Sequence, residues 1–240
     1  MGNLAAMLQE IGHTVTGSDH GVYPPMSIKL AEWQIEVKPF AAANIGHSDL
    51  YIVGNALSRG NPEVEAILRG NCPYLSLPQA LYEFFLKGKE VIVVAGTHGK
   101  TTTTFLVHHI LSEAGMSPGF FAGGVRADGH DGFAIGQGSA FVIEGDEYDS
   151  AFFDKASKFM HYHPHHLVLT AVEFDHADIF ENPADYERAF ARLLQLVPDN
   201  GLVVACKKDA GIARLLKNYK LAPVALYAEG TTSSFQIRGR

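Results

Sequence analysis

The segment VIVVAGTHGKTTTTFLVHHIL, residues 91–111, decides the fold of this chain. An apolar run typical of a buried strand leads directly into a short glycine-containing turn and then into a helical pattern. A strand, a glycine turn and a helix start, in this order, are the context of a phosphate-binding loop. The usual spacing places a glycine five residues ahead of the Gly-Lys pair, where this chain has Val94, so the loop is shorter than the common form.

The loop carries the groups that a nucleotide phosphate requires. Free backbone N–H groups and the positive end of the helix dipole attract an anion at a helix start. We expect Gly96 and Gly99 to let the main chain approach the phosphate oxygens, Lys100 to contact the β- and γ-phosphates, and Thr101 to coordinate Mg²⁺. The predicted nucleotide-binding residues are Gly96, Thr97, His98, Gly99, Lys100, Thr101 and Thr102.

Two acidic segments downstream are candidates for a metal site. FVIEGDEYD begins with a predicted strand that ends at Glu144, and in VEFDHADIF another strand ends near Glu173, Asp175 and His176. Ligands gather at the carboxyl ends of parallel strands, and Mg²⁺ prefers oxygen ligands, which a neutral imidazole can join. The histidine-rich run HYHPHH, residues 161–166, fits no familiar spacing of zinc ligands, so we assign no metal to it.

Composition limits the class of protein. The chain has 240 residues, of which 47% are hydrophobic and 19% charged, which is typical of a folded protein of two domains. Its net charge of -7 gives no long-range attraction to nucleic acid or to anionic lipid. With no apolar run of membrane length, no leader pattern and no paired cysteine spacing, we expect a cytoplasmic protein with neither nucleic acid nor membrane as partner.

The alternation of strand-like and helix-like segments predicts an α/β fold with mainly parallel sheets. The expected strands cover residues 13–17, 50–54, 74–77, 90–95, 141–144, 167–172, 202–206 and 224–227. The expected helices cover residues 3–11, 27–33, 62–69, 78–86, 100–114, 183–197 and 210–219. Lys87-Gly88-Lys89 is the predicted joint between an incomplete Rossmann-like domain, residues 1–88, and a P-loop-type domain, residues 89–240, that is truncated at its C-terminal end.

The motifs GTHGKTTT, EGDEYD and EFDHADIF, in this order, resemble the ATP-dependent Mur ligases, which join amino acids or peptides to a UDP-linked sugar acid. The shortened GTxGKT loop is a feature of that family. The resemblance runs from Met1 to about residue 205. Within the family, EGDEYDSAFFDKASKFMHYHP and VEFDHADIF most resemble the members that join the murein tripeptide L-alanyl-γ-D-glutamyl-meso-diaminopimelate to UDP-N-acetylmuramate.

This resemblance implies ATP and Mg²⁺ as cofactors, and UDP-N-acetylmuramate and a murein tripeptide as partners. It implies that Thr101 and Glu144 hold the first metal ion and His176 the second, with Lys100, Glu144 and His176 as catalytic residues. The segments GSD and NALSRGNPE match parts of the UDP-sugar site in the family. The predicted substrate-binding residues are Ser18, Asp19, Asn55 and Ser58.

The chain also departs from the family pattern. Met1-Gly2 resembles the end of the glycine-rich loop that grips UDP, and the third domain of the family is missing, so we expect this fragment alone to be inactive. Ala171 stands where relatives usually have Asn, which predicts a change in local hydrogen bonding. Two alternatives remain open: a UDP-N-acetylmuramate–L-alanine ligase of the same family, or a non-catalytic nucleotide-binding fragment.

Overall fold

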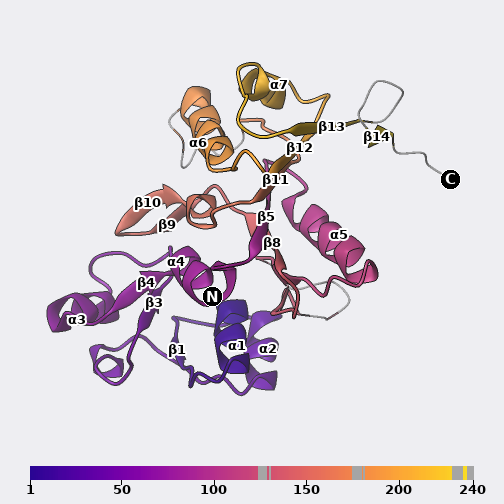
Figure 1. The fold of residues 1–240 in the computed structure, drawn as a ribbon. Coiled ribbons are helices and arrows are strands. Elements are labelled where there is room, and N and C mark those ends of the chain that lie inside the picture. Colours follow the sequence, from indigo (N-terminus) through magenta and orange to yellow (C-terminus); the bar gives the residue numbers. More distant parts are fainter. Residues whose placement is uncertain (124–128, 130, 175–179, 181, 229–234, 237–240) are drawn as a thin grey trace.

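The computed structural model describes residues 1–123, 129, 131–174, 180, 182–228 and 235–236, with only the backbone of the last two (Figure 1). A mainly parallel sheet forms the centre of the molecule. Its strands are β5 Glu90–Ala95, β6 Gly119–Phe121, β7 Phe133–Ala134, β8 Ala140–Gly145, β11 His166–Leu169, β12 Leu202–Cys206, β13 Val224–Ala228 and β14 Phe235–Gln236. The expected α/β class is confirmed.

The order of strands in this sheet is β14-β13-β12-β11-β5-β8-β6-β7, and every neighbouring pair is parallel except β6 and β7. β5 and β8 are almost continuously apolar, as expected for parallel strands buried on both faces. β5 lies between β8 and β11, so the segment that follows it leaves the middle of the sheet.

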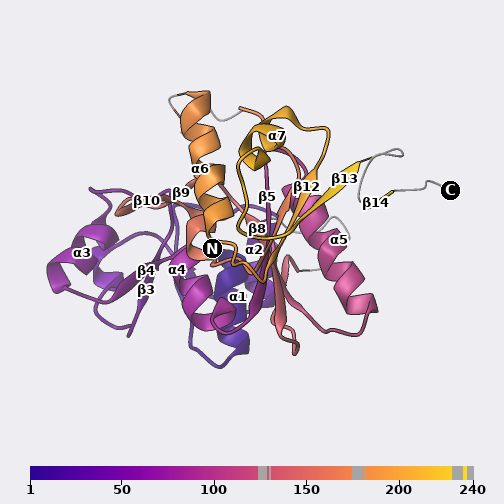
Figure 2. The ribbon, with the colours of Figure 1, turned by 45° about the horizontal axis from the view of Figure 1, so that its top comes forward.

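Helices cover both faces of the sheet. α5 Lys100–Glu113 packs on one face over a small core with Val94, Phe120 and Val142 at its centre. α6 Pro183–Gln195 and α7 Ala210–Leu216 pack on the other face, where the large core includes Leu167 and Val203. Figure 2 shows α5 and α6 on opposite sides of the strands.

Cover on the α5 face decreases toward β13. Val94, Val168, Val204 and Ala225 are partners in register across four strands and therefore lie on one face. Val94 is fully buried beneath α5, whereas the other three are only half-buried. The opposite face is better covered, because Leu169 and Ala205, which alternate with them, are fully buried.

The first 88 residues form helices around two short parallel strand pairs. The strands are β1 Gly17–Ser18 with β2 Val37–Lys38, and β3 Tyr51–Val53 with β4 Tyr74–Ser76. The helices are α1 Gly2–Glu10, α2 Met26–Glu32, α3 Pro62–Gly70 and α4 Leu77–Leu81, which continues as the π turn η2 Tyr82–Leu86, and the short helix η1 is Ala42–Asn44. The strand expected over residues 13–17 was wrong in extent, because only Gly17 of that range is paired.

The N-terminal part and the sheet share one hydrophobic core. This core joins Leu4 and Met7 of α1 to Phe121 and Phe141 of the sheet. The Asn3 side chain donates to the Ala122 carbonyl oxygen at 3.1 Å. The larger core thus continues past the expected joint at residues 87–89, while a smaller core around Val53, Val64 and Ile67 lies within the N-terminal part. The domain boundary at this joint stays a prediction.

A hairpin that the periodicity did not predict follows β8. It consists of β9 Asp149–Ala151 and β10 Asp154–Ser157 and leads into the short helix η3 Lys158–His161. Its residues are mostly polar, which is why no apolar alternation marks it. Among the described residues, no helix has the length and apolar character needed to cross a membrane.

Candidate functional site

The segment from Gly96 to Gly99 links β5 to α5 at the middle of the sheet. Gly96 has φ +139, and a Cβ there would lie 2.7 Å from the Ala171 carbonyl oxygen and 2.8 Å from its nitrogen. Gly99 caps α5 with φ +77, in the left-handed region. Gly96 is thus required by the close approach of the neighbouring chain, and Gly99 by the turn into the helix.

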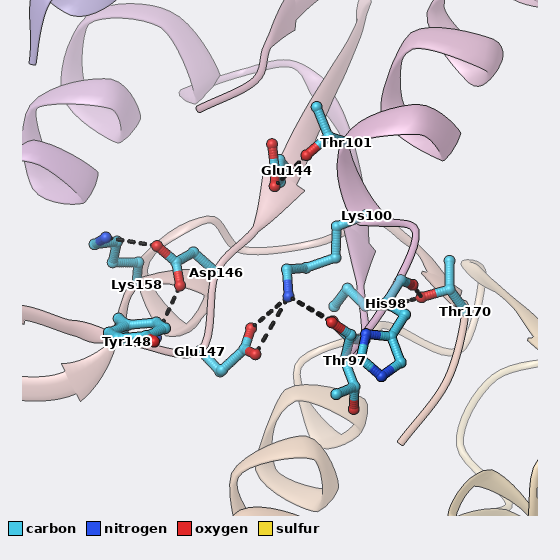
Figure 3. A network of polar contacts seen from close by, with 12 residues as sticks. Thr97, His98, Lys100, Thr101, Glu144, Asp146, Glu147, Tyr148, Lys158 and Thr170 are labelled. Carbon is cyan, nitrogen blue, oxygen red and sulfur yellow. Dashed lines mark hydrogen bonds and ion pairs between the residues drawn. The ribbon is translucent and has the colours of Figure 1, made fainter. Parts of the chain in front are cut away.

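Lys100 bends back over this loop (Figure 3). Its Nζ donates to the Gly96 carbonyl oxygen at 2.7 Å and lies 3.0 Å from Oε2 of Glu147. The Glu147 side chain has no exposed surface, and that of Lys100 is 15% exposed. The sequence reasoning missed Glu147: it lies in the quoted EGDEYD motif, but only the fold shows that it meets Lys100.

Thr101 and Glu144 lie together, as their proposed roles require. Thr101 Oγ1 donates to Glu144 Oε1 at 2.8 Å (Figure 3). Glu144 Oε2 accepts from the Gly123 N–H at 3.0 Å. A hydroxyl and a carboxylate are oxygen ligands that suit Mg²⁺, which keeps several waters and takes ligands from substrate phosphates. Among the described residues, no three His, Cys, Asp or Glu side chains cluster as a metal site. His176 and Asp175 lie outside the described residues.

The other loop residues have mainly structural contacts. Thr97 Oγ1 donates to the Glu173 carbonyl oxygen at 2.8 Å and accepts from the Glu173 N–H at 2.9 Å. Its single hydrogen is thereby used, so Tyr186, 2.8 Å away, donates to it. Thr170 Oγ1 donates to the His98 carbonyl oxygen at 2.6 Å. Sequence reasoning missed both Tyr186 and Thr170, because such ties join segments far apart in the chain.

Thr102 and Ala171 are the remaining positions of the loop region that the sequence singled out. Thr102 is exposed in the first turn of α5. The Ala171 carbonyl oxygen accepts from the Thr97 N–H at 2.8 Å, so the backbone at this position supports the loop.

A cavity of about 240 Å³ lies between the N-terminal part and the sheet, and we refer to it as the shared cavity. Its lining consists of Met1, Asn3, Met26, Asn55, Leu77, Phe121, Gly123, Glu144, Asp146, Ser150, Lys158 and Tyr162. It brings the predicted substrate residue Asn55 and the predicted metal ligand Glu144 to one space. Burial, followed by the charges of Asp146 and Glu144, raises the pKa of Tyr162 above its usual range, which keeps its hydroxyl neutral.

The other predicted substrate residues lie nearer the outside of the N-terminal part. Asp19 is exposed, and its charge acts on the α-amino group of Met1 at the cavity. Ser18 Oγ accepts from Asn44 Nδ2 at 3.5 Å, and Asn44 also donates to Glu63 at 2.6 Å. Ser58 is exposed and does not belong to the cavity lining. The structure thus brings Asn55 to Glu144 and leaves Ser18 and Ser58 apart from them.

The histidine-rich run is dispersed by the fold. His161 Nε2 lies 2.7 Å from Asp154 Oδ2 in the hairpin. Burial, followed by the charge of His165, lowers the pKa of His166 at the start of β11. The described residues of this run therefore contribute to packing and local pairing.

Comparison with known proteins identifies the family. A model of the Mur ligase middle domain matches residues 94–238, and one of the Mur ligase family, catalytic domain, matches residues 1–88. The chain belongs to the Mur ligase family. The phosphate-type loop and the Thr101–Glu144 contact of this Mur ligase chain lie in the part matched by the middle-domain model.

Two curated Mur ligases show how much of a relative's length this chain covers. The chain is 46% identical to the UDP-N-acetylmuramate--L-alanyl-gamma-D-glutamyl-meso-2,6-diaminoheptandioate ligase of Escherichia coli, over 90% of this chain and 48% of that protein. It is 33% identical to the UDP-N-acetylmuramate--L-alanine ligase of Acidithiobacillus ferrooxidans, over 99% of this chain and 50% of that protein. The chain spans about half the length of these curated relatives.

A solved Mur ligase has the same fold. The structure of the UDP-N-acetylmuramate:L-alanyl-gamma-D-glutamyl-meso-diaminopimelate ligase from Neisseria meningitides superposes with a TM-score of 0.88 at 42% identity. The match covers 94% of this chain and 74% of that one.

Proposed function

We propose that this chain forms the nucleotide-binding and sugar-nucleotide-binding part of an ATP-dependent amide ligase. The ligase joins the tripeptide L-alanyl-γ-D-glutamyl-meso-diaminopimelate to UDP-N-acetylmuramate in cell-wall recycling. The names of the relatives at 46% and 44% identity support this choice of substrates. ATP is the energy source and Mg²⁺ the metal.

The observation that carries the proposal is the shared cavity. Its lining includes Asn55, from the segment proposed to bind the sugar nucleotide, and Glu144, which contacts the loop proposed to bind phosphate. An acyl-activating ligase needs these two substrates in contact, because a carboxylate oxygen of one attacks the γ-phosphorus of the other.

In the proposed reaction, that attack breaks the bond between the γ-phosphorus and its bridging oxygen, and ADP leaves. The tripeptide amine then adds to the acyl phosphate carbon, and phosphate leaves as the amine loses a proton. Lys100 donates to the phosphate oxygens, and the backbone N–H groups at the start of α5 stabilise the same charge. Thr101 and Glu144 would hold Mg²⁺, which supplies further charge neutralisation when bound. His176 remains proposed as a second metal ligand.

Binding measurements on the 240-residue chain test the two half-sites. Calorimetry with Mg·ATP and, separately, with UDP-N-acetylmuramate should detect binding of each. Failure to bind Mg·ATP would contradict the role of the loop, and failure to bind the sugar nucleotide would contradict the role of the N-terminal part.

A hybrid protein tests the reaction, with residues 1–240 replacing the matching part of the Escherichia coli relative. Phosphate release should require the tripeptide and should be absent with L-alanine. Release with L-alanine alone would instead support the alanine ligase, to whose relative the chain is 33% identical. A folded hybrid that binds both nucleotides but releases no phosphate would favour a non-catalytic fragment.

A further inference from the structure

We infer that Lys158 is a binding residue for an anionic group of the sugar-nucleotide substrate. Lys158 lies within the quoted motif EGDEYDSAFFDKASKFMHYHP, but the motif assigned it no role; it begins the short helix η3 after the polar hairpin. The inference rests on the proposed function, because that function supplies a substrate with two kinds of anionic group, a diphosphate and a carboxylate.

The fold holds Lys158 in place on the wall of the shared cavity. Its Nζ lies 2.6 Å from Oδ2 of Asp146, and its side chain is 15% exposed. The backbone is fixed as well: the Lys158 N–H donates to the Tyr148 carbonyl oxygen at 2.9 Å, and the next N–H donates to the Asp146 carbonyl oxygen at 3.2 Å. Figure 3 shows Lys158 beside Asp146. Asp146 directly follows β8, the strand that carries Glu144.

The ammonium group has hydrogen-bonding capacity left for a ligand. An ammonium has three N–H donors, and among the described residues Asp146 is the hydrogen-bond acceptor for Nζ. The centroid of the Tyr148 ring lies 6.0 Å from Nζ. Two donors are therefore free to meet oxygen atoms in the cavity.

Among the described residues, the cavity lining combines one basic side chain with two carboxylates. Lys158 is the basic side chain among the described residues of the lining, where Glu144 is proposed for metal and Asp146 is paired with the lysine. The pKa of the Met1 α-amino group is lowered by burial and next by Lys158, so the lysine lies near the N-terminal end of α1. An anion that enters between Asn55 and Glu144 thus meets one fixed positive side chain, and charge-assisted hydrogen bonds of this kind are stronger than neutral ones.

Two sugar nucleotides distinguish the possible anions. UDP-N-acetylmuramate carries both the diphosphate and the carboxylate, whereas UDP-N-acetylglucosamine carries the diphosphate alone. Their dissociation constants would be measured by calorimetry for the unaltered chain and for Lys158→Met. Lys155→Met is the matched control, because Lys155 lies in the hairpin just before η3, is 72% exposed and pairs with Asp149 at 2.8 Å.

If Lys158 binds the carboxylate, Lys158→Met should weaken UDP-N-acetylmuramate about tenfold and leave UDP-N-acetylglucosamine unchanged. If it binds the diphosphate, both ligands should weaken about equally. Lys158→Arg should recover most of the affinity in either case, and Mg·ATP binding should not change. The double variant Lys158→Met/Asp146→Asn guards against misfolding, because it removes both charges of the pair.

The inference is overturned if Lys158→Met, or the folded double variant, binds both sugar nucleotides as tightly as Lys155→Met does. A different failure concerns the proposed function: an unaltered chain that binds neither sugar nucleotide removes the substrate itself, and this inference with it.

Discussion

Lys100 and Glu147 form an ion pair, so a substitution of either residue changes the electrostatic environment of the other. Glu147 is buried beside the loop, and the Lys100 ammonium group compensates its charge at 3.0 Å. Removing one partner of a buried ion pair costs more than removing both, because one charge is left in a poorly solvated place. Stability and ligand binding can therefore be separated with two substitutions.

Lys100→Met should lower the free energy of unfolding by about 3 kcal/mol and abolish Mg·ATP binding. Adding Glu147→Gln should restore more than half of the lost stability without restoring Mg·ATP binding. Urea unfolding and calorimetry measure the two effects. Lys87→Met is the control, since Lys87 is 63% exposed in a surface pair and should change neither quantity. Mg·ATP binding by the double variant would remove the role assigned to Lys100.

Gly96→Ala should be more damaging than an ordinary glycine substitution. Its Cβ would press on the Ala171 backbone, which also accepts a hydrogen bond from the Thr97 N–H. Gly88→Ala provides the comparison: Gly88 also has positive φ, +79, but its Cβ would meet nothing within 4 Å. We expect Gly88→Ala to cost about 1 kcal/mol and leave Mg·ATP binding intact. Equal losses of stability in the two variants would contradict the packing argument.

At the scale of elements, the turn before α3 is held by charge as well as by a helix cap. Asn61 accepts hydrogen bonds from the N–H groups of Glu63 and Val64, which caps the helix. Glu65 Oε1 lies 2.7 Å from Nε of Arg59 and accepts from the Gly60 N–H at 2.9 Å. These contacts fix the segment that also carries Asn55 and Ser58.

The Arg59 hydrogen bond, followed by the Gly60 N–H, lowers the pKa of Glu65 from 4.5 to about 2. A lowered pKa stabilises the fold above the unfolded value, so this contribution is present above about pH 4.5 and is lost as the pH falls toward 2. Carbon NMR of the Glu65 carboxyl group should follow this titration. Arg59→Gln should move its pKa back toward 4.5, whereas Arg69→Gln should move it little, because Arg69 acts through charge alone.

For the whole molecule, the continuous core predicts cooperative unfolding. Trp33, the single tryptophan, lies in the N-terminal part and contacts Phe133 of the sheet at a ring distance of 5.7 Å. Its fluorescence reports on the N-terminal part, and far-UV circular dichroism reports on the entire chain. The two thermal transitions should share one midpoint. Separate midpoints would show that residues 1–88 unfold independently of the sheet.

Local patterns predicted much of this architecture and less of the site. The strands 90–95 and 202–206 were predicted with their observed bounds, because each is an apolar run between clear breaks. The two-residue strands β1, β2 and β7 have no periodicity to detect. The position of the loop between a strand and a helix was predicted from its residues, and its role in binding a nucleotide stays a prediction. Glu147 and Tyr186 make contacts with the loop from distant segments, which the spacing of a motif does not encode.

The uneven cover of the large sheet has a consequence for the chain in solution. Leu106 and Ile110 on α5 are 54% and 55% exposed, and the valines Val168 and Val204 on the α5 face of the sheet are only half-buried. Apolar area of this kind favours self-association. Light scattering should therefore show particle size rising with protein concentration, and Leu106→Glu/Ile110→Glu should suppress the rise while Leu196→Glu, at the end of α6, should not. If the chain stays monomeric at all concentrations, the exposed apolar residues on this face do not cause self-association, and the weaker burial near β13 has little effect on solubility.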